Sequence, residues 1–512
     1  MPSSSALPQG WSDAQRQAFL SSRANRIARN AVVASGVNAA ARNASAMRSY
    51  HDTFSVSRKR VGKVTNQRHS GRCWMYSAFN VLRASTMELL DVDDFEFSQA
   101  YGMFYDKLEK ANATLERLIN LVDRPYDDRA LDFVLTEGMG DGGYYPFAMN
   151  LVTKWGLVPS KAMPETASSK DSTQMNARLG RLIRRDAARL RQMRGDGAEK
   201  EALRAAKGPM LEEAWRLLAI CLGEPPETFD LETPVGKDAK VDPAKVTEQQ
   251  GTAQAEKPGA ASGSKCAAEE DNKGDHQQER GENGEEDKRD EKPCRILRDP
   301  QITPRQFVEH YVPADPADYV ELVSLPGDKR PFGHVYHLTY TDSIVGGRPI
   351  HMFNVAPEIL DAAAIASLRS GIPCEMACDV MQDFPRGDED FGGILATDTM
   401  DYGALFDIDF AMDRADMYDL RESSLTHAMC FQGVELDEHG APVAWRVENS
   451  WGDKSCKDGY LVVSADWFHH YGGEVVVRRE FVPHELLELY DRTTAEDVAP
   501  WSGFGCVVPP LD

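Results

Sequence analysis

Four side chains that could together carry out nucleophilic chemistry occur in the chain order Gln67, Cys73, His427 and Asn449. A free thiol has a pKa near ~8.5 and is mostly protonated at neutral pH, so it needs help to become a nucleophile. A histidine can take the proton from the thiol and later give it to a leaving amine. The set therefore predicts cleavage of an amide bond by a cysteine nucleophile.

Each of these residues has a separate expected role. We expect Cys73 in the first turn of a helix, where free N–H groups and the helix dipole favour a thiolate, with His427 as its imidazolium partner in a resting ion pair. Asn449 would orient the imidazole, and Gln67 would donate to the tetrahedral oxyanion beside the backbone N–H of Cys73. Trp451 would shield the His–Asn hydrogen bond, and we also place it among the substrate-binding residues.

Taken one at a time, these residues have plainer explanations. A cysteine that opens a helix is usually a small buried apolar residue, and an Asn-Ser-Trp-Gly string such as 449–452 is usually a turn. The catalytic interpretation depends on the joint occurrence of all four, each in its own local string and in this order.

The elements that must position the four residues differ between the two halves of the chain. Apolar residues at helical spacing predict helices at 73–90, 98–121, 175–195 and 208–222. After residue 302 the pattern changes to short strands, with helices at 357–371 and 483–491; the strands are expected at 334–340, 349–354, 429–436, 443–448, 459–464 and 474–481. We therefore predict an α+β fold with two lobes and a site in the cleft between them.

Longer strings support a family resemblance. They are Phe-Glu-Phe-Ser-Gln-Ala-Tyr at 95–101, Asp-Gly-Gly-Tyr at 141–144, the segment 150–159, the segment 221–229, Ala-Cys-Asp-Val at 377–380 and Trp-Arg-Val-Glu-Asn-Ser-Trp-Gly at 445–452. With the four site residues, they resemble the bleomycin hydrolase, or aminopeptidase C, family of papain-like cysteine peptidases. The resemblance runs from about residue 20 to 502 and is interrupted by one insertion.

The resemblance implies a papain-like, two-lobed α+β peptidase with an inserted helical hook. It implies a cytosolic cysteine aminopeptidase that removes N-terminal residues from peptides and hydrolyses small aminoacyl amides, without a metal or other cofactor. It also implies a ring-shaped homohexamer. In the family the chain end lies in the cleft, so Asp512 is expected to bind substrate; Gly142 and Gly143 are expected to let an extended peptide approach their backbone.

The tail itself departs from the family pattern. Val-Ala-Pro-Trp at 498–501 matches the family, but the following residues differ from its usual Asp-Pro-Met-Gly-Ala-Leu-Ala-like ending and run a few residues longer. An endopeptidase or oligopeptidase with the same chemistry is therefore the main alternative to an aminopeptidase.

The expected organisation has five parts. Residues 1–60 form an N-terminal helical wrap, 61–230 the helical lobe with the hook, 300–501 the strand-rich lobe, and 502–512 the tail. Residues 238–294 are rich in Gly, Ser, Gln, Glu and Lys, and we expect a disordered, dispensable acidic and polar insertion there.

Composition restricts the other functions. The net charge of −23 argues against a nucleic-acid-binding scaffold ring, and no apolar run is long enough for a membrane span. Nine cysteines without a paired pattern and an N-terminus without a secretory signal indicate a reducing compartment, the cytoplasm. Transglutaminase-type acyl transfer also uses Cys and His but normally adds Asp, so Asn449 counts against it.

Overall fold

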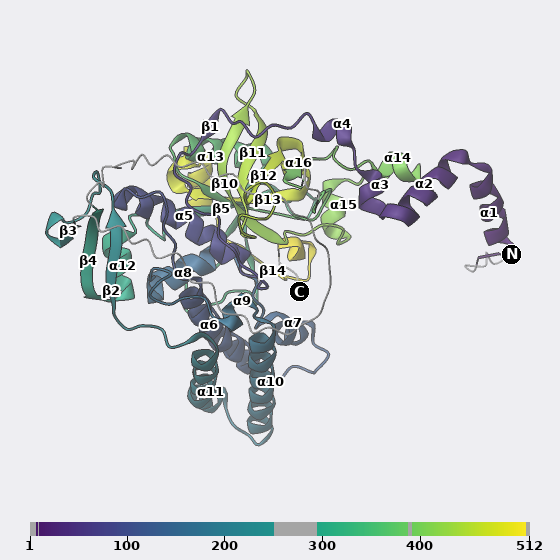
Figure 1. The fold of residues 1–512 in the computed structure, drawn as a ribbon. Helices are drawn as coiled ribbons and strands as arrows, with labels where there is room; N and C mark the ends of the chain where they lie inside the picture. The colour runs from purple at the N-terminus through teal and green to yellow at the C-terminus, as the bar shows by residue number, and fades with distance from the viewer. Residues whose placement is uncertain (1–6, 9, 250–293, 388–391, 508–512) are drawn as a thin grey trace, which may run out of the picture.

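A helical lobe and a strand-rich lobe pack face to face, with a pair of long helices below and an arm to one side (Figure 1). The computed structural model describes residues 7–8, 10–249, 294–387 and 392–507. The mixed helix and sheet content confirms the α+β class that the sequence predicts.

The helical lobe is built around α5 (Cys73–Leu90), which has the bounds that the sequence predicts. Nearly every side chain of α5 is buried, because one side packs against the sheet and the other against α8 (Tyr145–Trp155). The helix ends at Asp91, which adopts a left-handed conformation. Smaller helices complete the lobe: α7 (Arg129–Glu137), α9 (Ala167–Lys170) and α12 (Pro304–Tyr311).

The hook consists of α6 (Gln99–Asn120), α10 (Thr173–Gly195) and α11 (Lys200–Leu222), which run alongside one another at the bottom of Figure 1. Their contact stripe is apolar, with Leu115, Leu190 and Leu218 almost fully buried. On the outer surface of α11, however, Trp215 and Ile220 remain 42% and 79% exposed.

The strand-rich lobe is a long, mainly antiparallel sheet in the order β14-β6-β7-β5-β13-β8-β10-β11-β12-β9, with β1 added to β10. Helix α13 (Pro357–Arg369) covers one face of the sheet and α5 covers the other. Two further helices, α16 (Ala465–Tyr471) and α17 (His484–Arg492), flank the sheet. The loops of this lobe contain the short helices α14 (Tyr402–Phe406) and α15 (Arg414–Asp419). The strands are β1 (Val56–Ser57), β5 (Tyr319–Val323), β6 (His334–Leu338), β7 (Met352–Asn354), β8 (Cys374–Cys378), β9 (Ile394–Leu395), β10 (His427–Leu436), β11 (Pro442–Glu448), β12 (Tyr460–Ser464), β13 (Gly472–Arg478) and β14 (Glu496–Val498).

The predicted disordered insertion at 238–294 is wrong at its beginning, where a second, small sheet forms. Strands β2 (Phe229–Val235) and β3 (Val246–Gln249) both pair with β4 (Cys294–Ile302), so residues 238–249 are ordered. Lys245 forms an ion pair with Asp299 at 2.7 Å, and Val241 packs on the core. Composition missed this because the stabilising partners lie some fifty residues away in sequence. The rest of the predicted insertion, up to residue 293, lies outside the described residues.

The N-terminal helices also differ from the expected wrap. Helices α1 (Trp11–Ser21) and α2 (Arg23–Ser35) contain no buried residue and project from the body as an arm (Figure 1). Contact with the body begins where α2 and α3 (Val37–Ala41) meet α14, and it continues through α4 (Ala44–Met47) and β1; Ala41 is the first buried residue. The wrap is therefore limited to roughly the second half of the predicted segment 1–60. After α4 this half has no further helix and runs on to β1.

Candidate active site

The fold brings the four predicted side chains to the interface between the lobes. Cys73 is the first residue of α5, His427 is the first residue of β10, and Asn449 directly follows β11. The Cys73 thiol accepts a hydrogen bond from the backbone N–H of Ala428, so the thiol lies beside the chain that carries His427. All four side chains are buried.

The imidazole of His427 is held in one orientation. Its Nε2 lies 2.9 Å from Asn449 Oδ1, and the indole of Trp451 packs over the ring with 4.9 Å between centroids. Asn449 Oδ1 also accepts from the backbone N–H of Ser450 at 2.7 Å, which fixes the amide in turn. Because Nε2 is taken by Asn449, Nδ1 is the ring nitrogen that remains for a proton exchange with the thiol.

Gln67 lies on a loop that joins the two lobes. Its Oε1 accepts from Ser450 Oγ at 2.6 Å, its Nε2 donates to the carbonyl of Ser70 at 2.7 Å, and its backbone N–H donates to the Ser450 carbonyl. An amide nitrogen carries two N–H groups, so one N–H of Gln67 remains beyond the bond to Ser70. With the free backbone N–H expected at the first helical residue, this N–H could bind an oxyanion.

Burial changes the expected charge state of the thiol and the imidazole. It raises the pKa of Cys73 to about 11 and lowers the pKa of His427 to about 4. Both shifts disfavour the charged form, as desolvation does for any buried group. Burial therefore acts against the resting ion pair predicted from the sequence, whereas the helix terminus at Cys73 acts in its favour.

Gly142 and Gly143 lie beside the nucleophile helix. A side chain at Gly143 would meet the ring of Trp74 at 2.5 Å, and the Trp74 indole N–H donates to the Asp141 carbonyl at 2.8 Å. The carbonyl of Gly142 is occupied by the Lys110 ammonium. Gly143 is buried, and among the described residues none bonds to its backbone.

A buried ionic network lies next to residues 141–144, the segment called the glycine strand below, and it was not predicted. Asp141 accepts from the backbone N–H of Gly71 and from the side chains of Ser172 and Asn176, and pairs with Lys107 at 2.6 Å. Burial by itself would raise the pKa of Asp141, but the ion pair and these hydrogen bonds lower it well below its usual range. The network ties the loop before Cys73 to the glycine strand. Its only sequence signal is an Asp beside Gly-Gly.

This network gives a testable expectation. Replacing Asp141 by Asn should leave the Lys107 ammonium buried without its counter-ion and lower the free energy of unfolding by about 3–5 kcal/mol. Because the Gly71 loop would also loosen, kcat should fall more than the melting temperature alone explains, even well below that temperature. Denaturant unfolding and steady-state kinetics measure the two effects. Asp132→Asn, an exposed position on α7, is the matched control, and equal behaviour of both variants would contradict the proposed role.

A second unpredicted pair fixes Asn449 itself. Glu448, the preceding residue, is fully buried and pairs with Arg83 on the nucleophile helix at 2.5 Å, while Gln432 donates to its other oxygen at 2.7 Å. Arg83 also donates to the carbonyls of Val61 and Lys63. The strand that ends at Asn449 is thereby attached to the helix that begins at Cys73.

The C-terminal segment crosses from one lobe to the other near the cleft. The ring of Trp501 stacks on Tyr340 and contacts Phe133 of α7 edge to face, while Arg421 donates to the carbonyls of Trp501 and Ser502. Phe504, in the short 3-10 helix at 503–507, packs on Tyr336. Asp512, predicted to bind substrate, lies outside the described residues.

Neither a candidate metal site nor a candidate membrane span occurs among the residues that the structure describes. Within the described ranges, no group of three or more His, Cys, Asp or Glu side chains is arranged to hold a metal ion. None of the helices in the same ranges combines the length and apolar character of a membrane crossing.

Comparison with known proteins places this site in a family. The model of the peptidase C1-like family matches residues 10–250 and 287–505. Aminopeptidase C of Streptococcus thermophilus is 32% identical, with 86% of each chain covered. Aminopeptidase G of Lactobacillus delbrueckii subsp. lactis is 33% identical over 95% of this chain and 98% of its own. The crystal structure of PepW from Lactobacillus rhamnosis HN001 superposes with a TM-score of 0.82 at 32% identity, covering 98% of this chain and 99% of PepW.

Proposed function

The chain belongs to the peptidase C1-like family, and because its relatives are aminopeptidases we propose that it is a cysteine aminopeptidase of the aminopeptidase C, or bleomycin hydrolase, type. Its substrates would be peptides and small aminoacyl amides. The observations that support the chemistry are the Cys73 thiol beside the backbone of Ala428, the residue after His427, and the bond from Nε2 of His427 to Asn449, which leaves Nδ1 for the thiol.

The proposed reaction starts from a neutral thiol and imidazole. Cys73 Sγ attacks the carbonyl carbon while Nδ1 of His427 takes the thiol proton, so the two charges form together next to each other. The backbone N–H of Cys73 and an N–H of Gln67 stabilise the oxyanion. The imidazolium then protonates the leaving amine, a thioester remains on Cys73, and water activated by His427 hydrolyses it.

The glycine strand is proposed to align the substrate. An extended peptide can pair with the free backbone groups of Gly143, with Trp74 behind the strand. Trp451, stacked on His427, is proposed to keep water from the His–Asn hydrogen bond and to line the substrate side of the ring.

The C-terminal tail is proposed to restrict cleavage to the N-terminus of substrates. The rings of Tyr340 and Phe133 hold Trp501 between the lobes, and Arg421 fixes the next turn, so the segment that precedes the tail is anchored to both lobes. A carboxylate at the tail end, that of Asp512, would pair with a substrate α-ammonium. Such a charge-assisted contact is worth about 1–3 kcal/mol, one to two decades in selectivity.

Removing residues 505–512 tests this assignment and keeps Trp501 and Phe504 in place. We expect cleavage of N-acetylated peptides to rise and cleavage of free aminoacyl amides to fall by about ten- to a hundredfold in kcat/KM. Asp512→Asn with its own terminal carboxylate intact is the matched control for the side-chain charge. If the full chain already prefers N-acetylated peptides and truncation changes nothing, the enzyme is an endopeptidase.

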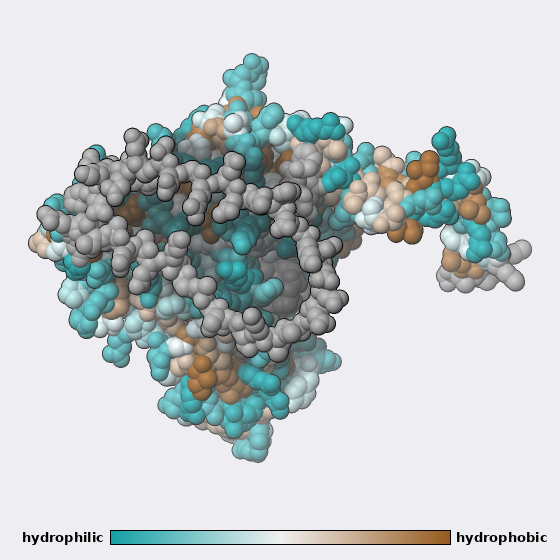
Figure 2. Space-filling view, in the orientation of Figure 1, coloured by the Kyte–Doolittle hydropathy of each residue, from teal (hydrophilic) through white to brown (hydrophobic). Residues whose placement is uncertain are grey.

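We also propose that the protein assembles into a ring-shaped homohexamer. The arm supports self-association, because α1 and α2 bury none of their residues and carry exposed apolar side chains such as Trp11, Phe19 and Ile27. Figure 2 shows apolar surface along the arm and a second apolar patch over the hook helices at the bottom of the view. The exposed apolar residues of α11 in the hook include Trp215 and Ile220. Two separate apolar surfaces on one chain favour a head-to-tail contact that closes into a ring.

Light scattering tests the assembly directly. The expected mass is about six times 56.9 kDa, and removal of residues 1–35 should yield smaller species because the arm contact is lost. Trp215→Ala, which alters the hook patch, should also yield smaller species, because this patch is the other proposed contact surface. A full-length protein that stays monomeric at micromolar concentration would rule the ring out.

The proposed compartment is the cytoplasm. The cysteines whose side chains the structure describes, Cys73, Cys221, Cys374, Cys378, Cys430 and Cys456, are free thiols. A thiol nucleophile surrounded by other free thiols suits a reducing compartment.

A further inference from the structure

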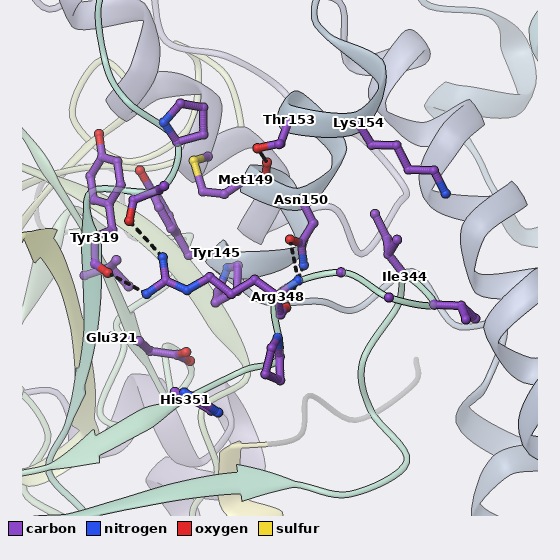
Figure 3. Close-up of a pocket in the computed structure, with 18 of the residues that line it drawn as sticks. Tyr145, Met149, Asn150, Thr153, Lys154, Tyr319, Glu321, Ile344, Arg348 and His351 are labelled. Carbon is purple, nitrogen blue, oxygen red and sulfur yellow. Dashed lines mark hydrogen bonds between the residues drawn. The ribbon is translucent and has the colours of Figure 1, made fainter. Parts of the chain in front are cut away.

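A cavity of about 420 Å³, whose lining includes Tyr145, lies between α8 and the sheet (Figure 3). Its walls come from α8, β5, β13 and the loop at 344–351. Neither the four site residues nor Gly142 and Gly143 line it. The volume lies within the range of small-molecule sites in proteins, about 300–1,000 Å³.

One buried carboxyl group lines this cavity without a partner. Glu321, on β5, is 4% exposed, and neither of its oxygens has a hydrogen-bond partner among the described residues. Figure 3 shows the Glu321 side chain reaching from the sheet into the space between Arg348 and His351. Buried polar atoms are nearly always bonded, so this carboxyl group indicates a donor that binds from outside the chain.

The positive charges around the cavity are already engaged. The Arg348 guanidinium donates to the carbonyls of Ala317 and Tyr319, and the Lys154 ammonium pairs with Glu109 at 2.5 Å. Burial lowers the pKa of His351, so its imidazole is neutral at neutral pH. Among the described residues, no cation forms a hydrogen bond with Glu321, and the charge of Arg348 acts on it only through space.

Other carboxyl groups stand behind Glu321 in the sheet. Glu321 and Glu375 both lie opposite Val476 in the strand register, and Glu474 is on the same face of β13. Burial and the charge of Glu474 raise the pKa of Glu321 well above its usual range, and burial raises that of Glu474 to about 7. Asp342 adds to this effect and Arg348 opposes it. Burial and these neighbouring charges thus favour the protonated form of Glu321.

We propose that this cavity binds a small organic monoamine, whose ammonium group bonds to Glu321 and whose apolar body fills the space between α8 and the sheet. The walls match such a ligand, because Tyr145, Met149, Tyr319, Val476 and Tyr490 surround the carboxyl group. A second ammonium would meet Lys154 and Arg348 at the rim, so a diamine should bind less well. A ligand of roughly ten non-hydrogen atoms fits the volume.

Binding should release a proton. An ammonium donor favours the ionised carboxylate, so Glu321 gives up its proton to the solvent as the amine enters. The ligand and Glu321 then form a buried, hydrogen-bonded ion pair, and the charge of the site stays balanced. This coupling separates the proposal from nonspecific filling of an apolar hollow.

Isothermal titration calorimetry of the full-length protein with 2-phenylethylamine tests the site. Titration at pH 7 in two buffers of different ionisation enthalpy should show release of about one proton. 2-Phenylethanol, the neutral counterpart, should bind about 10- to 100-fold more weakly. Glu321→Gln should weaken amine binding by a similar factor and remove the proton release.

Two further variants locate the ligand. Glu137→Gln alters a carboxyl group that lines the hollow beside Gly142 and Gly143, and it should leave amine binding unchanged. Thr153→Trp changes an exposed position on α8 at the cavity mouth and should block binding without disturbing the core, also in case Glu321→Gln does not fold. Loss of binding in Glu137→Gln but not in Glu321→Gln, equal affinity for the alcohol, or no binding at all would each overturn the proposal. None of these outcomes bears on the peptidase activity.

Discussion

Replacing Cys73 by Ala should abolish turnover of an aminoacyl-fluorogenic amide and labelling by an epoxide-type thiol inhibitor. Removal of the nucleophile from a comparable catalytic set lowers kcat by about 10⁴–10⁶, which leaves only the background from binding and the oxyanion site. The overall fold should persist, because Ala fits the space of a buried thiol at the start of α5.

Cys221→Ala is the matched control for this loss. Cys221 is a free, partly exposed thiol on α11 of the hook, well separated in sequence from the site residues. It should leave activity and labelling as in the natural protein. Full activity in the Cys73 variant, or a loss of labelling in the Cys221 variant, would remove Cys73 from its proposed role.

The second large effect is expected at Gln67. Gln67→Ala should lower kcat by about 10²–10³, the usual effect of losing one oxyanion donor, with little change in KM because the contact forms mainly in the transition state. Steady-state kinetics with the same amide measure both parameters.

Ser450→Ala distinguishes this role from a structural one. Ser450 Oγ holds Gln67 Oε1 at 2.6 Å without touching substrate, so its loss should only loosen the amide and lower kcat by a smaller factor. If Gln67→Ala raised KM and left kcat unchanged, Gln67 would serve ground-state binding instead of the oxyanion.

The sequence predicted best where one local pattern decides the structure. The helix at 73–90 has a nearly continuous apolar surface and needs no distant partner to be identified, and its observed bounds agree. The strands that carry His427 and Asn449 were found because their apolar residues cluster between turns, although β10 begins two residues earlier than expected. The comparisons with aminopeptidases confirm the family that the site strings indicated.

The missed features depend on contacts between distant segments. Two buried ion pairs were missed. Asp141 pairs with Lys107, 34 positions away, and Glu448 pairs with Arg83, 365 positions away. No local pattern in the sequence predicts that these charged residues are buried. The strand β3 was missed for the same reason, because its pairing with β4 spans the predicted insertion. Burial of the thiol and the imidazole disfavours their charged forms, and this burial depends on both lobes, so it is not visible in the local sequence.

The cysteine aminopeptidase activity is tested most directly by comparing kcat/KM for two substrates of the full-length enzyme. One is an aminoacyl amide with a free α-amino group and the other is its N-acetylated counterpart, and both are repeated with Cys73→Ala. We expect a preference of one to two decades for the free amine and no turnover of either substrate by the variant. Equal or faster cleavage of the N-acetylated substrate, or turnover that survives in the variant, would contradict a cysteine aminopeptidase.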